Sequence, residues 1–216
     1  VKECITCASG TDALLIPLMA KNISAGHAVF TTNFSFFATT EVISLAGATP
    51  VFIDIDKKTF NINPFLLEAG IKKTIKEGKL IPKAIIVVNL FGQLADYTTI
   101  KKIAKKYNLF LIEDAAQSFG ATFKKNKSCS FGDTAATSFF PAKPLGCYGD
   151  GGAIFTNSIR LANKYRSIRV HGKGSDKYDN VRIGVNGRLD TIQAAILLAK
   201  LEIFDDEIKS RNQIAK

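Results

Sequence analysis

Short apolar runs alternate with longer amphipathic stretches along most of the chain. The apolar runs are continuous and do not alternate with polar residues, a pattern typical of strands covered on both faces. A strand-like segment directly follows Val1. The other predicted strands are residues 28–32, 50–55, 83–89, 109–114, 135–140 and 152–156.

The stretches between these runs carry apolar residues at helical spacing. In the last of them Ile192, Ile196 and Ile203 lie on one stripe together with small residues. The predicted helices are residues 11–21, 38–46, 64–77, 97–107, 159–168 and 190–204. Alternation of strand and helix over most of the length predicts an α/β domain with a mainly parallel sheet.

The two ends of the chain look cut. A strand-like segment begins immediately after Val1, and no feature near Lys216 marks a natural terminus. After the last predicted helix, residues 205–209 (Asp-Asp-Glu-Ile-Lys) look like the start of a second helix. We therefore expect one domain over residues 1–204, with residues 205–216 beginning a connection to a further domain that is absent.

Composition and charge favour an ordinary globular protein with a basic surface. The 216 residues are 46% hydrophobic and 22% charged, and the net charge is +10. Short lysine clusters carry much of that charge and predict solvated helix faces, or attraction to an anionic small molecule such as a phosphorylated cofactor. Nucleic-acid binding is disfavoured because no basic arm or nucleic-acid motif appears.

The sequence favours the cytoplasm over a membrane. Its apolar runs, such as residues 84–88, are far too short to span a bilayer, and no signal peptide is visible. Cys4 and Cys7 formally make a C-x-x-C pair, but no second pair and no histidine at zinc spacing accompany it. No metal site is expected, and buried free thiols at a strand end are favoured over a redox motif.

Lys143 is the strongest candidate for chemistry. It follows the apolar run at 135–140 within a segment rich in proline and glycine, where a tight approach to a ligand is favoured over a free surface lysine. Asp114 ends an earlier buried strand. A lysine amine can form a Schiff base with pyridoxal 5′-phosphate (PLP), and a carboxylate can hold the pyridine nitrogen protonated.

Other residues suit the same cofactor, each with a simpler alternative. Gly10 and Thr11 open a helix whose backbone N–H groups could hold a phosphate, although an ordinary N-cap at Ser9 explains them as well. Ser138 could also bind phosphate, and Gln117 could donate to the ring oxygen. The aromatic run that contains Phe36, at residues 34–37, is explained by plain core or by stacking on the pyridine ring.

Six segments in this order resemble one family. They are S-G-T-D-A-L, N-F-S-F-F-A-T, V-F-I-D-I-D-x-x-T-F-N-I, E-D-A-A-Q, S-F-F-P-x-K-x-L-G-x-Y-G-D-G-G and N-G-R-L-D-x-x-Q-A-A-I-L. They resemble the sugar-nucleotide aminotransferases of the DegT/DnrJ/EryC1/StrS family over essentially the whole chain. The resemblance implies PLP fold type I, the aspartate aminotransferase fold, whose large domain has a seven-stranded, mainly parallel sheet flanked by helices.

The resemblance also implies roles for individual residues. Lys143 would form the Schiff base, Asp114 and Gln117 would face the ring, Phe36 would stack on it, and Gly10, Thr11 and Ser138 would bind phosphate. In family members two sites are shared across a homodimer, so Asn186 would reach a phosphate in the other subunit. Arg188 would meet a carboxylate of glutamate or of the sugar. His171 could touch substrate, although a satisfied loop histidine is the simpler interpretation.

The detailed amino-acid sequence of the last two segments is most similar to one branch of this family. Its members use glutamate to aminate a UDP-linked 2-acetamido-2-deoxy-3-keto-hexuronate for bacterial surface polysaccharide such as O-antigen. Two alternatives stay open: a 4-keto-sugar aminotransferase of the same family, and a truncated homologue that does not catalyse. Family members also have an N-terminal segment and a small C-terminal domain that are not in this sequence.

Overall fold

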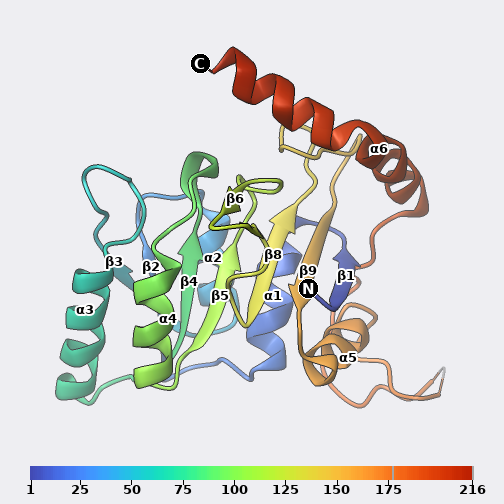
Figure 1. Ribbon diagram of the computed structural model, residues 1–216. Helices are drawn as coiled ribbons and strands as arrows, with labels where there is room; N and C mark the ends of the chain where they lie inside the picture. The colour runs from blue at the N-terminus through green and yellow to red at the C-terminus, as the bar shows by residue number, and fades with distance from the viewer. Residues whose placement is uncertain (177, 216) are drawn as a thin grey trace.

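A seven-stranded sheet runs through the protein in the computed structural model, which describes residues 1–176 and 178–215 (Figure 1). Strand β9 is antiparallel to both of its neighbours, and every other pair in the sheet is parallel. The predicted α/β class and mainly parallel sheet are therefore confirmed. In spatial order the strands are β1 (Glu3–Cys7), β9 (Gly152–Thr156), β8 (Thr134–Ser138), β5 (Phe110–Asp114), β4 (Ile81–Val88), β2 (His27–Thr32) and β3 (Thr49–Ile53).

Six α-helices accompany the sheet in the described part of the chain. They are α1 (Gly10–Ala20), α2 (Ala38–Leu45), α3 (Pro64–Glu77), α4 (Tyr97–Lys106), α5 (Ile159–Ile168) and α6 (Thr191–Ile214). The helices and strands predicted up to residue 190 are present, with ends moved by a few residues, and the last helix ends at Ile214 instead of residue 204. The small hairpin of β6 (Thr122–Phe123) and β7 (Asn126–Lys127), and the short 3-10 helix η1 (Leu90–Gly92), were not predicted. None of the described helices has the length and apolar character that crossing a membrane requires.

Helices cover both faces of the sheet, and this explains the continuous apolar runs. Along β4, Ala84 and Ile86 enter the core formed with α1 and α5, whereas Ile85 and Val87 enter the core formed with α3 and α4. Figure 1 shows α3 and α4 in front of the sheet and α1 and α2 behind it. Parallel strands covered on both faces have no polar side, so their sequences do not alternate.

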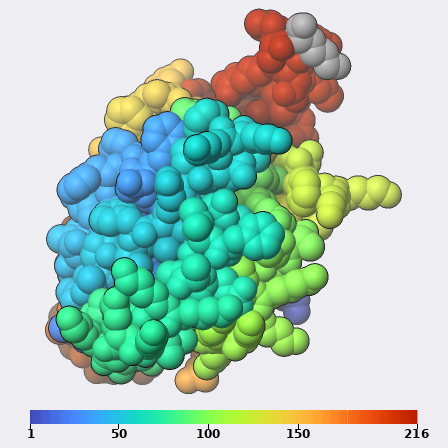
Figure 2. All heavy atoms as spheres, turned by 90° about the vertical axis from the view of Figure 1, so that its left-hand side faces the viewer, coloured from blue at the N-terminus to red at the C-terminus, as the bar shows by residue number. Residues whose placement is uncertain are grey.

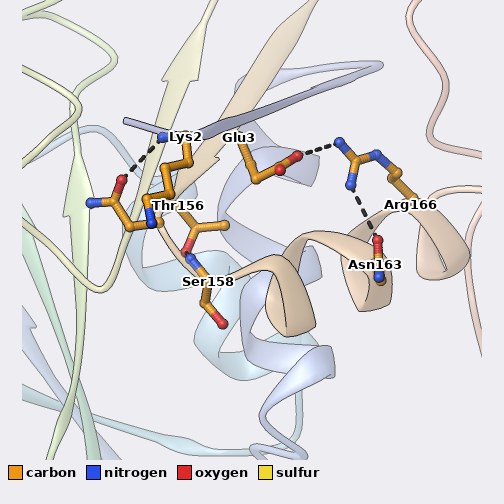
Figure 3. Close-up of polar contacts among 7 residues, drawn as sticks. Lys2, Glu3, Thr156, Ser158, Asn163 and Arg166 are labelled. Atoms are coloured by element: carbon orange, nitrogen blue, oxygen red, sulfur yellow. Dashed lines mark hydrogen bonds and ion pairs between the residues drawn. The ribbon is translucent and has the colours of Figure 1, made fainter.

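The edge strand β1 separates Cys4 from Cys7. Cys7 is buried with Ile5 in the core beneath α1, while Cys4 is exposed. Residues three apart on a strand point to opposite faces, so these thiols do not face each other. The prediction of two buried thiols is wrong for Cys4. Figure 3 shows how this strand is held: Arg166 of α5 reaches Glu3 at 2.6 Å, and the N–H of Lys2 donates to Asn157.

Helix α6 is a single helix through residue 214, so the prediction of a second helix starting at Asp205 is wrong. The acidic residues that look like a helix start make pairs one turn apart. Asp206 pairs with Lys209 at 2.8 Å, and Glu207 pairs with Arg211 at 3.4 Å. Such pairs stabilise a continuous helix. Figures 1 and 2 show its C-terminal half standing out from the body of the protein.

Candidate functional site

A cavity of about 560 Å³ lies where β4, β5 and β8 end and α1 begins. The carboxyl ends of parallel strands are the usual place for ligand sites in open α/β sheets. Seven residues predicted for the cofactor line this cavity: Gly10, Thr11, Phe36, Asp114, Gln117, Ser138 and Lys143. The structure therefore brings together side chains from four separate sequence segments.

A second, larger hollow of about 870 Å³ lies at the opposite end of the strands, where β2, β4, β5 and β8 begin. It is lined by residues such as Lys21, His27 and Lys83, and by none of the predicted site residues. It is more open to solvent than the first cavity, so we place the candidate site in the smaller one.

Asp114 lies at the floor of the cavity and is 5% exposed. Its carboxylate accepts hydrogen bonds from Thr39 Oγ1 at 2.9 Å and from the Ala116 N–H at 3.2 Å. Burial raises the pKa of Asp114, and these two bonds and the charge of Lys143 oppose the rise. No cation among the described residues lies within ion-pair distance of this carboxylate, so a positively charged ring nitrogen of a ligand would supply the missing partner.

Gln117 is oriented by a backbone group outside the cavity wall. Its Oε1 accepts a 2.7 Å hydrogen bond from the N–H of Phe91, a residue with a positive φ of 57°. A left-handed conformation is costly for phenylalanine, so its presence at this contact is a functional clue. With the oxygen engaged, the amide nitrogen of Gln117 is left as a donor for a ligand in the cavity.

The N-terminus of α1 forms one wall of the cavity. Ser9 Oγ accepts from the Asp12 N–H at 3.0 Å, while the N–H groups of Gly10 and Thr11 have no acceptor among the described residues. A Cβ added at Gly10 would lie 2.6 Å from Ser138 Cβ, so glycine lets the helix end approach Ser138 closely. Two free N–H groups beside a serine hydroxyl at a helix N-terminus suit a phosphate.

Lys143 lies in a closed loop of residues 139–151, which we call the lysine loop. The N–H of Cys147 donates to the Phe139 carbonyl at 2.7 Å, and the N–H of Lys143 donates to the Phe140 carbonyl at 2.9 Å. Lys143 Nζ is 6.0 Å from the centre of the Phe36 ring. Phe36 is 70% exposed, so its face is available to a ligand at the mouth of the cavity.

Three predicted residues lie outside this cavity. His171, Asn186 and Arg188 are exposed, and Asn186 forms a bridge with Val170. Their segment is attached beside the start of α1, because the Ala8 N–H donates to Gly187 O at 3.0 Å. The structure therefore does not bring these three residues together with the other seven.

Two buried polar residues in or next to the site were missed by sequence reasoning. Thr39 is one, although it lies within the N-F-S-F-F-A-T segment. Glu113 is the other: it is fully buried and accepts bonds from Asn89, Ser128 and the N–H groups of Cys129 and Phe131 at 2.8–3.1 Å. Burial raises the pKa of Glu113, and these four donors oppose the rise. Only the adjacency of two acids at the end of an apolar strand could have signalled this network.

The family profile described as the DegT/DnrJ/EryC1/StrS aminotransferase family matches residues 1–216. The chain belongs to this family. A protein of Pseudomonas aeruginosa named UDP-2-acetamido-2-deoxy-3-oxo-D-glucuronate aminotransferase is 54% identical over 99% of this chain and 57% of its own length.

Solved structures support the same relationship. A DegT/DnrJ/EryC1/StrS aminotransferase from Brucella abortus is 58% identical, with a TM-score of 0.99 over 100% of this chain and 58% of that one. The structure of NtdA from Bacillus subtilis, described with bound cofactor PMP, is 33% identical, with a TM-score of 0.86 over 94% of this chain and 45% of that one. This chain spans 45–58% of the length of these relatives, and it has the fold of aminotransferases.

Proposed function

We propose that this chain is the cofactor-binding part of a PLP-dependent aminotransferase that moves an amino group from glutamate to a nucleotide-linked keto-sugar. The best-supported acceptor is a 3-keto UDP-hexuronate, because the Pseudomonas aeruginosa relative is named for that substrate. Action in the cytoplasm, as a homodimer, for surface polysaccharide such as O-antigen is part of the proposal. The observation that carries it is the meeting of Lys143, Asp114, Ser138 and the start of α1 at one cavity.

The residues of the cavity fit PLP. Asp114 has no cationic partner in the described chain, the N–H groups of Gly10 and Thr11 are free, and Lys143 is the one basic side chain among the described residues of the lining. When bound, PLP supplies a ring that withdraws electrons from the bond broken beside the transferred nitrogen.

The chain's own residues would divide the work around that ring. Asp114 would hold the ring nitrogen in its protonated form, and the amide nitrogen of Gln117 would donate to the ring oxygen. The N–H groups of Gly10 and Thr11 and the hydroxyl of Ser138 would bind phosphate. Lys143 would hold the cofactor through its Nζ, and once the amino group of the substrate had displaced that Nζ, the freed amine would move the proton between the substrate carbon and the cofactor.

A second copy of the chain would complete the site. The cavity lining contains Asp114 and Asp150 against Lys143 alone, so it lacks positive charge for a phosphate. Asn186 and Arg188 are exposed and are not among the residues that line this cavity, which suits a role in the site of a second copy. A guanidinium fork would also match a substrate carboxylate.

An assay with separate substrates tests the activity. The chain, loaded with PLP, is given glutamate with a 3-keto UDP-hexuronate or with a 4-keto nucleotide sugar, and 2-oxoglutarate is measured. We expect turnover with the 3-keto substrate and none in Lys143→Ala. Preference for the 4-keto sugar would replace the proposed substrate, and turnover in Lys143→Ala would contradict the mechanism.

Mixed dimers test the shared site. Lys143→Ala and Arg188→Ala are each expected to be inactive. When the two are expressed together, each mixed dimer has one intact site, so about a quarter of the parent activity should return. Failure of the mixture to regain activity, with dimers present, would contradict sharing of the site.

A further inference from the structure

The lysine loop is held against one face of α6 by three polar contacts. Gln193 Oε1 accepts from the Tyr148 N–H at 2.8 Å, and Lys200 Nζ donates to the Gly146 carbonyl at 2.6 Å. Arg211 Nη1 reaches the Pro144 carbonyl at 3.3 Å. Lys200 lies about two turns after Gln193 and Arg211 about five turns after it, so the three side chains share a face of α6. Figure 1 shows α6 lying across the connection between β8 and β9, where this loop runs.

Close packing supports these contacts. Leu197 and Phe204 of α6 are buried against Phe139, Leu145 and Cys147 of the loop. A Cβ added at Gly149 would lie 3.0 Å from the amide nitrogen of Gln193, so the backbone passes directly over that side chain. The lysine loop therefore packs on α6 on both sides of Gly146.

Lys200 is the strongest of the three contacts. Its ammonium group is half-buried, donates the shortest of the three bonds, and lies 4.7 Å from the centre of the Tyr148 ring. A charged donor makes a stronger hydrogen bond than a neutral one. Arg211 is exposed and its contact is longer, so it contributes less.

We infer that Lys200, assisted by Gln193, is a positioning residue that fixes the lysine loop before the cofactor binds. Gly146 follows Lys143 by three residues, and its Cα approaches Pro141 so closely that a Cβ would lie 2.4 Å from the Pro141 carbonyl oxygen. Anchoring Gly146 to α6 therefore anchors the tight turn that carries Lys143. Ordering such a loop in advance removes an entropic cost from cofactor capture.

Hydrogen exchange on the cofactor-free chain tests this inference without relying on activity. Lys200→Met keeps the aliphatic stem over Tyr148 but removes the donor, and Lys200→Arg restores a donor. We expect amide exchange in residues 139–151 to become about tenfold faster in Lys200→Met and to return most of the way in Lys200→Arg. Lys209→Met is the control, because Lys209 lies on the same helix and its ion pair among the described residues is with Asp206 of that helix, not with the lysine loop.

Cofactor capture gives the second readout, and it rests on the proposed function. PLP is added and the growth of the lysine-bound visible absorption is followed; we expect about tenfold slower growth in Lys200→Met and parent-like growth in Lys209→Met. Unchanged loop exchange in Lys200→Met would overturn the positioning role, and so would faster exchange with unchanged capture when the parent chain captures PLP. Should Lys200→Met not fold, Gln193→Ala gives the same comparison at the Tyr148 amide.

The two proposals fail in different ways. If the parent chain never captures PLP while Lys200→Met still speeds amide exchange in the lysine loop, the positioning role of Lys200 stands and the proposed function fails. If the parent captures PLP on Lys143 and Lys200→Met changes neither the loop exchange nor the rate of capture, the proposed function stands and the positioning role of Lys200 fails.

Discussion

Thr39 Oγ1 donates a 2.9 Å hydrogen bond to Asp114 Oδ2, which ties helix α2 to the end of β5 at the floor of the cavity. Both residues are buried. Because this bond favours the charged carboxylate, it opposes the rise that burial causes in the pKa of Asp114. The same threonine also lies 2.8 Å from Ser35 Oγ, another residue of the cavity lining.

Replacing Thr39 by valine keeps the shape of the side chain and removes the donor. We expect Thr39→Val to lose about 1 kcal/mol of unfolding free energy and to bind PLP about tenfold more weakly, because Asp114 is then less readily ionised. Denaturant unfolding and a PLP titration measure the two effects. Thr40→Val, one position along α2, is the matched control, and equal PLP affinity in both variants would contradict the role of Thr39.

Asp114→Asn separates stability from function. Because burial raises the pKa of Asp114 above its ordinary value of 3.8, the folded cofactor-free chain keeps this proton where the unfolded chain has lost it. The parent therefore loses stability as pH rises from that value through the raised pKa. We expect Asp114→Asn to be more stable than the parent at neutral pH, with a gap that shrinks toward about pH 4.

The same substitution should lower aminotransferase turnover by at least about 100-fold, because the anion that would face the ring nitrogen is gone. Thermal unfolding across pH, without cofactor, and a turnover assay give the two results. A variant that is less stable than the parent at neutral pH would contradict the description of Asp114 as a carboxylate lacking a cation.

Glu113→Gln should destabilise the protein. Both oxygens of Glu113 accept from backbone N–H groups, so one side of a glutamine amide would place N–H against N–H. We expect a loss of about 1–3 kcal/mol in denaturant unfolding, whereas the exposed Glu77→Gln should change stability by less than about 0.5 kcal/mol. Equal stability of the two variants would show that the buried network does not depend on the Glu113 carboxylate.

Gly10→Ala tests whether the cavity wall formed by the start of α1 and Ser138 binds the phosphate of PLP. The added methyl group would lie 2.6 Å from Ser138 Cβ, so the start of α1 or the end of β8 must shift. We expect PLP affinity to fall at least about tenfold, with a much smaller change for pyridoxal, which lacks the phosphate. An equal loss for both compounds would mean that this wall does not hold the phosphate.

Local sequence signals predicted the strands of the main sheet, the approximate places of the helices and most of the residues that were expected around the cavity. Asp114 and Ser138 end β5 and β8, which are neighbours in the sheet, and Lys143 lies in the loop that follows β8, so placing the strands correctly brings the three residues together. The extent of α6 was misjudged because acidic residues that resemble a helix start are also compatible with a helix interior when basic partners follow one turn later.

Contacts between distant segments could not be predicted in this way. The partners of Glu113 come from residues 89, 128, 129 and 131, and their meeting depends on the pairing of β4 with β5 and on the path of the loop after Gln117. The grip of α6 on the lysine loop depends likewise on residues 45 to 67 positions apart. Exposed residues such as Asn186 and Arg188 carry no signal of their own about what they face.

The identity of the lysine that carries the cofactor tests the central claim most directly. The chain is incubated with PLP, reduced with borohydride and digested, and the modified peptide is mapped. We predict that the label is found on Lys143 and that Lys143→Ala gives no comparable label elsewhere. A label spread over surface lysines, or one concentrated on another lysine, in a folded protein would contradict the assignment of this cavity as the cofactor site.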